Sequence, residues 1–329
     1  MMSVQMGIDI AKDSFEIHLL NGDEAPESAG FDNNPSGFKK LRRFVKKRNV
    51  KQLHACMEAT GHYGEALAEF LYEQGFEVSV VNPARIKAYG QSQLRRNKTD
   101  RLDAALIADF CRSQKPPLWT PPPPHWRELQ GLVRHLADLE VDRQRQRNRL
   151  DALQHSASPS AIIQNNLQQQ IQFLSEQIQQ VKNNIQEHID HHPDLKRERD
   201  LLVSIKGVGR LTAAKLMAEF RAITHFDDVR QLVAFAGLNP RHRQSGSSIK
   251  GRTRISKMGR ASIRATLYMP AVVARQHNPI LKSFADRLQQ RGLNNMEIIV
   301  AVMRKLLHLA YGILKSGQPF DPHYLESQA

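Results

Sequence analysis

The sequence predicts an α/β domain followed by a mainly helical region. Up to residue 115 the apolar pattern switches between the period of a strand and that of a helix, which is typical of α/β folds. Prolines crowd the next segment, and beyond it nearly all apolar patterns are helical. We therefore expect four parts: an α/β domain at 1–115, a proline-rich linker at 116–125, a coiled coil at 126–192 and a helical domain at 193–329.

The first two strands are indicated by alternation. Residues 4–10 place apolar side chains on one face and Asp9 on the other. Phe15, Ile17 and Leu19 repeat the alternation after a short connection, so we expect an antiparallel pair. Helices and strands then alternate, with a helix at 37–47. The other predicted elements are strands at 52–57 and 77–81, a helix between them, and a last helix from Asp100. This is the element order of an RNase H-like fold.

Acidic residues lie at the ends of these elements. Glu58 follows a strand just before the turn Ala59-Thr60-Gly61, at the sheet edge where α/β folds place their chemistry. Asp100 and Asp103 have i, i+3 spacing in a helical pattern, so their carboxylates share one face. Thr99 suits the N-cap, and acids in a first turn complement the helix dipole, so an ordinary helix start also explains the pair.

An RNase H-like fold would bring Asp9, Glu58, Asp100 and Asp103 together over one end of its sheet. Clustered carboxylates repel each other unless a cation neutralises them, and oxygen ligands favour Mg²⁺ or Mn²⁺. Two such ions, about 4 Å apart, activate an attacking oxygen and stabilise a leaving oxygen in phosphodiester chemistry. These four acids are therefore our candidate metal ligands and catalytic residues.

Two long helices are expected after the linker. Leucines at heptad positions run from Leu129 to Leu153, and a second heptad series runs from Leu167 to Ile185 after a turn at 156–160. This pattern indicates an antiparallel hairpin or coiled coil. Heptads do not specify the number of chains, so intramolecular packing and dimerisation both fit.

The C-terminal domain begins with a turn that resembles a helix-hairpin-helix. Lys206, Gly207 and Gly209 lie between two helical segments, where exposed backbone N–H groups would bind DNA phosphates irrespective of base. A GxG pattern also occurs in ordinary turns, so a plain connection is the alternative.

A basic segment follows, with eight Lys or Arg and no acid between Arg241 and Arg264. Backbone phosphates of a nucleic acid are the natural partners of such a segment. The predicted nucleic-acid-binding residues here are Arg241, Arg243, Lys250, Arg252, Arg254, Lys257 and Arg260, joined by Lys98 ahead of the acidic helix. Whether Arg252, Arg254, Lys257 and Arg260 also assist catalysis is left open.

The basic segment contains the serines Ser245, Ser247 and Ser248 in a short flexible loop. The simpler interpretation is that the loop binds phosphates. Alternatively, one serine attacks a phosphodiester, since nearby cations stabilise the developing charge. Residue chemistry alone does not choose among the three.

Composition points to a nucleic-acid partner. Lys and Arg total 47 against 33 Asp and Glu, which gives a net charge of +14, although a generic basic surface would have the same charge. Two cysteines without metal-ligand spacing argue against disulfides and structural zinc. The N-terminus is unlike a secretion signal, and charged residues interrupt the apolar stretch 298–314. We expect a cytoplasmic protein without a membrane span.

Five blocks of the sequence together resemble a known family. They are Gly7-Ile8-Asp9-Ile10-Ala11-Lys12, Glu58-Ala59-Thr60-Gly61, 97–104 (NKTDRLDA), Ala234-Phe235-Ala236-Gly237-Leu238 and Ser245-Gly246-Ser247-Ser248. In this order they resemble the DEDD insertion-sequence transposases of the IS110 family, which includes bridge-RNA-guided recombinases and is related to Piv-type DNA invertases. The resemblance covers nearly the whole chain.

The resemblance implies a RuvC-like N-terminal domain whose acids Asp9, Glu58, Asp100 and Asp103 bind magnesium. It also implies a C-terminal transposase domain in which Ser245 is the nucleophile and forms a phosphoserine link to DNA. A structured bridge RNA would pair with donor and target DNA. Homodimers would assemble into a tetramer on the bacterial nucleoid, with acids and serine supplied by different protomers.

Two other functions stay open at this stage. One is a metal-dependent nuclease of the Holliday-junction type, in which water attacks and the serine loop only binds phosphate. The other is a nucleic-acid scaffold without catalysis, for which the four acids would be dispensable.

Overall fold

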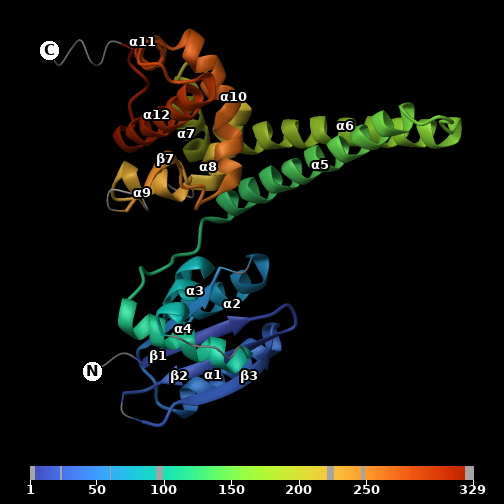
Figure 1. Cartoon of the computed structure of the whole chain (residues 1–329). Helices are drawn as coiled ribbons and strands as arrows, with labels where there is room; N and C mark the ends of the chain where they lie inside the picture. The colour runs from blue at the N-terminus through green and yellow to red at the C-terminus, as the bar shows by residue number, and fades with distance from the viewer. Residues whose placement is uncertain are drawn as a thin grey trace. The chain divides into compact units, whose positions relative to one another are not determined.

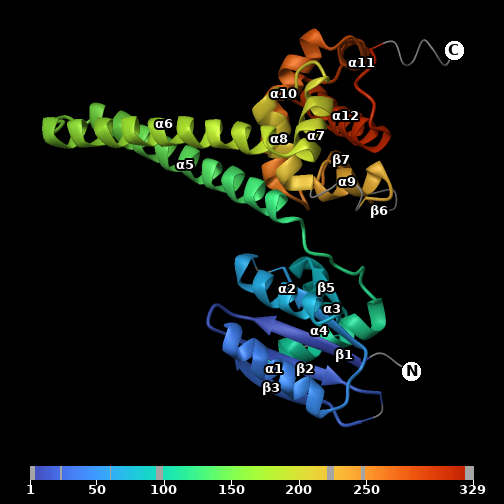
Figure 2. The same cartoon turned by 180° about the vertical axis from the view of Figure 1, so that it is seen from behind.

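The computed structural model describes residues 4–22, 24–59, 61–93, 99–220, 226–245 and 249–322, without the side chains of 242–254. The chain divides into two compact units, Met1–Pro121 and Pro122–Ala329 (Figures 1 and 2). Each unit has a hydrophobic core of its own.

The first unit is built on a five-stranded sheet with the order β3-β2-β1-β4-β5. Strands β1, β2 and β3 are antiparallel neighbours, whereas β4 and β5 run parallel to β1. The mixed sheet agrees with the predicted RNase H-like, α/β arrangement. The strands are β1 (Val4–Ile10), β2 (Ser14–Leu20), β3 (Glu27–Asp32), β4 (Leu53–Glu58) and β5 (Glu77–Val81).

Strand β3 was absent from the predicted elements. None of its residues is fully buried, because it lies at the sheet edge, so it lacks the apolar alternation that identifies a half-buried strand.

In the described residues of the first unit, four α-helices and a short 3₁₀ turn accompany the sheet. They are α1 (Pro35–Lys47), η1 (Gly61–Gly64), α2 (Glu65–Glu73), α3 (Pro83–Ser92) and α4 (Asp100–Gln114). Helix α3, like β3, was absent from the predicted elements. Its start is nevertheless well encoded, since the Asn82 side chain accepts from the N–H of Ala84 and Pro83 takes the first helical position. Helix α4 starts where predicted, with Thr99 Oγ1 accepting from the N–H of Leu102 at 3.3 Å.

Helix α4 packs directly on strand β1 at Gly7. A Cβ atom at Gly7 would lie 2.1 Å from the carbonyl oxygen of Ala104 and 2.2 Å from the amide nitrogen of Ala108, so only glycine fits. Toward the other end of α4, Cys111 Sγ lies 3.8 Å from the carbonyl oxygen of His54. The backbone of β1 and the backbone of α4 are thus in contact, and this fixes the helix along the strand.

Two buried cysteines lie between α4 and the sheet. Cys56 on β4 and Cys111 on α4 are both reduced and at most 1% exposed. Their shared hydrogen bond, together with burial, raises the pKa of the Cys56 thiol.

The start of the proline-rich segment belongs to the first unit. Ser79 Oγ donates to the carbonyl oxygen of Pro117 at 2.9 Å, and the N–H of Trp119 donates to that of Val78 at 2.6 Å. The Trp119 ring packs against the first core. The division between the units therefore falls within the prolines that follow.

The second unit is mainly helical. Its elements are α5 (Pro124–Gln154), α6 (Ala161–Asp190), α7 (Pro193–Val203), α8 (Arg210–Phe220), α9 (Val229–Phe235), β6 (Pro240–Ser245), β7 (Ile249–Ile255), α10 (Ala261–His277), α11 (Pro279–Gln290) and α12 (Asn295–Ser316). Strands β6 and β7 form an antiparallel hairpin. No helix in the described ranges is long and apolar enough to span a membrane.

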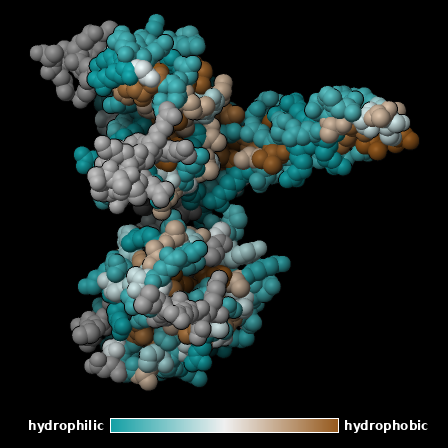
Figure 3. Space-filling view, viewed as in Figure 1, coloured by the Kyte–Doolittle hydropathy of each residue, from teal (hydrophilic) through white to brown (hydrophobic). Residues whose placement is uncertain are grey.

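Helices α5 and α6 lie side by side and project from the rest of the second unit (Figures 1 and 2). Heptad residues such as Leu129, Leu136, Ile178 and Ile185 are buried, and they belong to the same core as the helices from α7 onward. Most of the visible surface of this helix pair is hydrophilic, with apolar atoms at its far end (Figure 3). The coiled coil itself stays a prediction.

We predict that Gly7→Ala lowers the free energy of unfolding by about 3 kcal/mol, because the methyl group would push α4 away from β1. Urea denaturation followed by circular dichroism measures this effect. The control is Gly131→Ala on α5, where an added Cβ meets nothing within 4 Å and alanine is the better helix former. Equal stability of Gly7→Ala and the wild type would contradict the close packing of α4 on β1.

Candidate active site

Asp9 and Glu58 are neighbours across two parallel strands. The register of β1 and β4 pairs Gly7 with Cys56 and, as its last pair, Ile8 with Met57. Asp9 and Glu58 each follow this last pair, so they lie on adjacent strands where the pairing ends. Each acid is partly exposed. Their adjacency follows from the strand register. The sequence alone predicted that each acid lies at the end of a strand, but not that the two strands are neighbours.

Both acids face the layer that contains α4. Gly7 touches α4, and Asp9 lies two residues further on the same face. The C-terminal part of α4 lies near His54, which pairs with Gln5 at the start of β1. The first turn of α4, with Asp100 exposed and Asp103 partly exposed, therefore lies toward the sheet end that carries Asp9 and Glu58.

The donor chemistry of these acids fits a hard divalent cation, since carboxylate oxygens are the ligands that Mg²⁺ and Mn²⁺ prefer. Asp9 and Glu58 suit a pair of such ligands by their place in the sheet. Among the described residues, however, no three or more His, Cys, Asp or Glu side chains lie close enough together to hold a metal ion. The structure thus brings two acids together and directs the other two toward the same sheet end, without gathering all four.

A further acid, Glu16, lies on the other side of Asp9. Strand β2 pairs Glu16 with Asp9 on one side and with Gly30 of β3 on the other. A Cβ atom at Gly30 would lie 2.4 Å from Glu16 Oε1, so the carboxylate lies over this glycine. Sequence reasoning did not select Glu16, although the alternation of β2 already put it on the face opposite Phe15 and Ile17.

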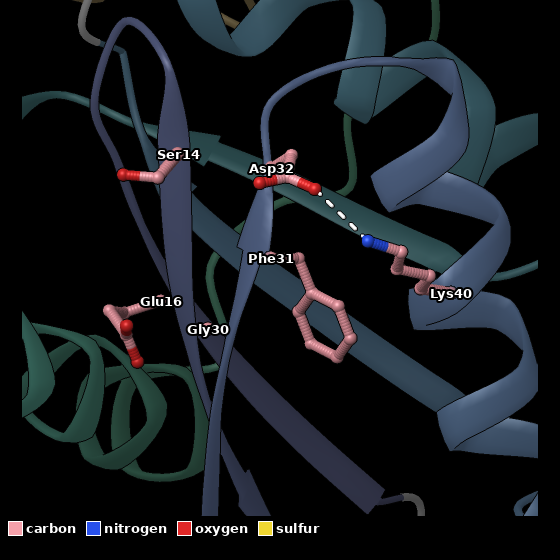
Figure 4. Close-up of a pocket in the computed structure, with 6 residues that line it drawn as sticks. All are labelled: Ser14, Glu16, Gly30, Phe31, Asp32 and Lys40. Atoms are coloured by element: carbon pink, nitrogen blue, oxygen red, sulfur yellow. Dashed lines mark hydrogen bonds and ion pairs between the residues drawn. The ribbon is translucent and has the colours of Figure 1, made fainter.

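Glu16 also lines a pocket of about 280 Å³ at the outer edge of the sheet (Figure 4). Lys40 on α1 closes one side of this pocket through an ion pair of 3.1 Å with Asp32. The remaining lining residues are Ser14, Gly30 and Phe31.

The predicted nucleophile Ser245 is the last residue of β6, where its backbone pairs with Ile249. Its side chain lies outside the described atoms, as do the side chains of Arg243, Lys250, Arg252 and Arg254 on the same hairpin. Lys98, Ser247 and Ser248 lie outside the described residues altogether. The acids belong to the first unit and Ser245 to the second.

The turn between α7 and α8 holds the three residues predicted to bind phosphate. Lys206 and Gly209 are exposed. Gly207 has a φ of 107°, and a Cβ atom there would lie 2.8 Å from the Cβ of Ala274 on α10. Packing against α10 is therefore sufficient to explain a glycine at 207. The helix-hairpin-helix stays a prediction.

The basic residues after β7 differ in their surroundings. Arg260 forms an ion pair of 2.9 Å with Glu219, whose side chain is only 16% exposed, and lies over the Phe235 ring. Lys257 is exposed, as is Arg241 on β6. Arg260 thus has a structural partner that the sequence pattern did not reveal, because Glu219 lies far away in the chain.

Comparison with known proteins agrees with the block pattern. A DEDD transposase model of the IS110 type matches residues 6–159, and a model described as Transposase IS116/IS110/IS902 family matches residues 199–286. The pilin gene-inverting protein of Moraxella bovis is 33% identical over 98% of both chains. The chain belongs to the IS110 family of transposases.

Other relatives of this transposase are more distant. The transposase for insertion sequence element IS1328 of Yersinia enterocolitica is 23% identical over 96% of this chain and 98% of its own length. RuvC of Thermus thermophilus in complex with a Holliday junction substrate aligns with 36% of the chain and all of its own length, at 12% identity and a TM-score of 0.27. Membership of the family makes the chain an enzyme that cuts and rejoins DNA.

The contrast between Arg260 and Lys257 is testable. Arg260→Gln should lower the free energy of unfolding by about 2 kcal/mol, because the largely buried Glu219 loses a charge-assisted hydrogen bond. Lys257→Gln should leave stability unchanged and reduce the slope of log K against log[salt] for DNA binding by about one. Urea denaturation and fluorescence anisotropy at several salt concentrations measure both quantities. An Arg260→Gln variant of full stability but reduced salt slope would instead assign Arg260 to phosphate binding.

Proposed function

We propose that this transposase joins DNA strands through Ser245, with Asp9, Glu58, Asp100 and Asp103 as its metal-binding acids. The observation that carries the proposal is the position of Asp9 and Glu58, each one residue beyond the last paired residues of β1 and β4, at the sheet end toward which α4 begins. Carboxylates on adjacent strands repel each other, and a bound cation relieves this repulsion, so the adjacency of the two acids favours a role in holding a cation. Two bound Mg²⁺ or Mn²⁺ ions would neutralise the negative charge of the phosphate and polarise it.

In the proposed reaction the Ser245 hydroxyl attacks a DNA phosphorus. A bond forms between Oγ and phosphorus, the bond to one DNA oxygen breaks, and that oxygen leaves with a proton. A second DNA hydroxyl then attacks the phosphoserine and releases the serine. Exposed cations such as Lys257 and Arg241 would hold the DNA backbone in place.

A structured bridge RNA is the proposed source of sequence specificity. Base pairing between this RNA and the donor and target DNA would select the sites, and the protein would hold backbones and shape. The net charge of +14 supports a role for the protein in binding backbones, since many Lys and Arg side chains can contact phosphates. The turn from α7 to α8 would act as a helix-hairpin-helix on one of these backbones.

The proposed assembly is a tetramer of two dimers in which acids and serine come from different protomers. The α5–α6 pair, as a coiled coil, would supply an association surface. Exposed apolar residues near the start of α6, Ile162 and Ile163, support a contact there. The enzyme would act in the bacterial cytoplasm, at the nucleoid.

Ser245→Ala should abolish covalent protein–DNA adducts while DNA binding persists within about twofold, because only the attacking oxygen is removed. Adducts are measured by gel mobility after denaturation, in cells that carry the gene with its native flanking DNA. Ser247→Ala and Ser248→Ala are the matched controls and should still form adducts. If adducts persist in Ser245→Ala but are lost in Ser247→Ala or Ser248→Ala, the serine whose replacement removes the adducts is the nucleophile.

Asp9→Asn in the same assay separates the remaining possibilities. The proposed function requires that it also abolish recombination, because the cation site loses a ligand. Cleavage that continues in Ser245→Ala but stops in Asp9→Asn would instead establish a nuclease that uses water. Recombination that survives replacement of all four acids by Asn or Gln would establish a scaffold without metal chemistry.

The RNA partner is tested by purifying the protein and sequencing the RNA that accompanies it. We expect one RNA species, encoded beside the gene, with loops that match the flanks of the element and its target. Random cellular RNA would contradict guidance by RNA and leave the chemistry of the acids and Ser245 as a separate question.

A further inference from the structure

The Asn33 side chain connects two loops at the active-site end of the sheet. Asn33 follows β3 and is half-buried. Its Nδ2 donates to the carbonyl oxygen of Ala11 at 3.0 Å and to the carbonyl oxygen of Tyr63 at 3.0 Å. A longer contact of 3.4 Å reaches the carbonyl oxygen of Lys12.

The geometry makes use of both amide hydrogens. An Asn amide nitrogen carries two hydrogens, so its two short bonds can be formed at the same time, one to each loop. Because the acceptors are backbone carbonyls, the amide nitrogen and not its oxygen must face them. The backbone N–H of Asn33 also donates to the carbonyl oxygen of Asp13 at 2.9 Å, which anchors the residue itself on the first loop.

These loops follow the strands that carry the two acids. Ala11 and Lys12 begin the turn after β1, just beyond Asp9, and Tyr63 lies in η1, just beyond Glu58. The packing of η1 on the end of β1 is close, since a Cβ atom at Gly64 would lie 3.0 Å from Ile10 Cδ1. Asn33 is thus a bridge between the two segments that leave the candidate metal site.

We propose that Asn33 is a positioning residue that holds the strand ends bearing Asp9 and Glu58 at a fixed separation. This role rests on the proposed function of the two acids. The printed pairing between β1 and β4 ends at Ile8 and Met57, and beyond these residues the Asn33 side chain supplies hydrogen bonds to both loops. Misplacement of reacting groups by about 1 Å can cost on the order of 100-fold in rate, so a small loosening here has a large effect on chemistry.

The test uses the full chain and two variants that remove the donor by different routes. Asn33→Leu has a similar shape without polar atoms, and Asn33→Asp has the same shape but only accepts. The matched control is Asn34→Asp at the adjacent position. There the side-chain oxygen accepts from the N–H of Gly37 at 3.0 Å, a role that aspartate keeps.

Two measurements follow the consequences. Amide hydrogen exchange at 11–14 and 61–65 should become roughly fivefold faster or more in both Asn33 variants, while exchange in β1 and β4 stays unchanged. Recombination in cells should fall about tenfold or more in both variants and stay within about twofold in Asn34→Asp. The melting temperature should fall by only a few degrees, because no core side chain is lost.

Several outcomes would overturn the proposal. Unchanged loop exchange would disprove the bridge, and faster exchange with full recombination would disprove its positioning role. Recombination that returns on cooling in step with refolding would identify a purely structural residue. If Asp9→Asn recombines normally, the proposed metal site itself is wrong, and the exchange data then still report separately on whether Asn33 bridges the loops.

Discussion

The contact between α4 and β1 at Gly7 is the constraint on which the first unit depends. A helix normally keeps its backbone away from a sheet by the length of its side chains, but here Ala104 and Ala108 come within 2.2 Å of where a Cβ at Gly7 would be. The absence of a side chain at Gly7 determines both the distance between α4 and the sheet and the position of α4 along β1. As a result, the acidic first turn of α4 is directed to the same end as Asp9, which lies two residues beyond the contact.

Most elements of the first unit could be predicted from local sequence patterns. Strands 4–10 and 77–81 were predicted with the bounds they have, because buried strands carry strong apolar patterns. The start of α4 was also correct, since an N-cap threonine leaves a clear local signal. Strand β3 and helix α3 were missed for the opposite reason: β3 is an edge strand without buried residues, and α3 has few buried positions.

The candidate site was less predictable than the fold, because it depends on pairings between distant segments. Asp9 and Glu58 were each recognised at an element end, yet only the register makes them neighbours. Glu16 was overlooked although it flanks Asp9, since no pattern within β2 states which residue it opposes. Charge density in the basic segment likewise could not separate Arg260, held by Glu219, from the exposed Lys257.

The burial of both cysteines has a practical consequence for spectroscopy. Cys56 and Cys111 are enclosed between α4 and the sheet, so neither thiol is accessible to a reagent in the folded enzyme. Neither native cysteine should therefore react with a thiol-specific label in the folded wild-type protein. A thiol introduced at an exposed position of each unit, such as Glu73 on α2 and Met269 on α10, could carry a fluorophore or spin label. Distances within and between protomers then become measurable during a reaction, without replacing either native cysteine.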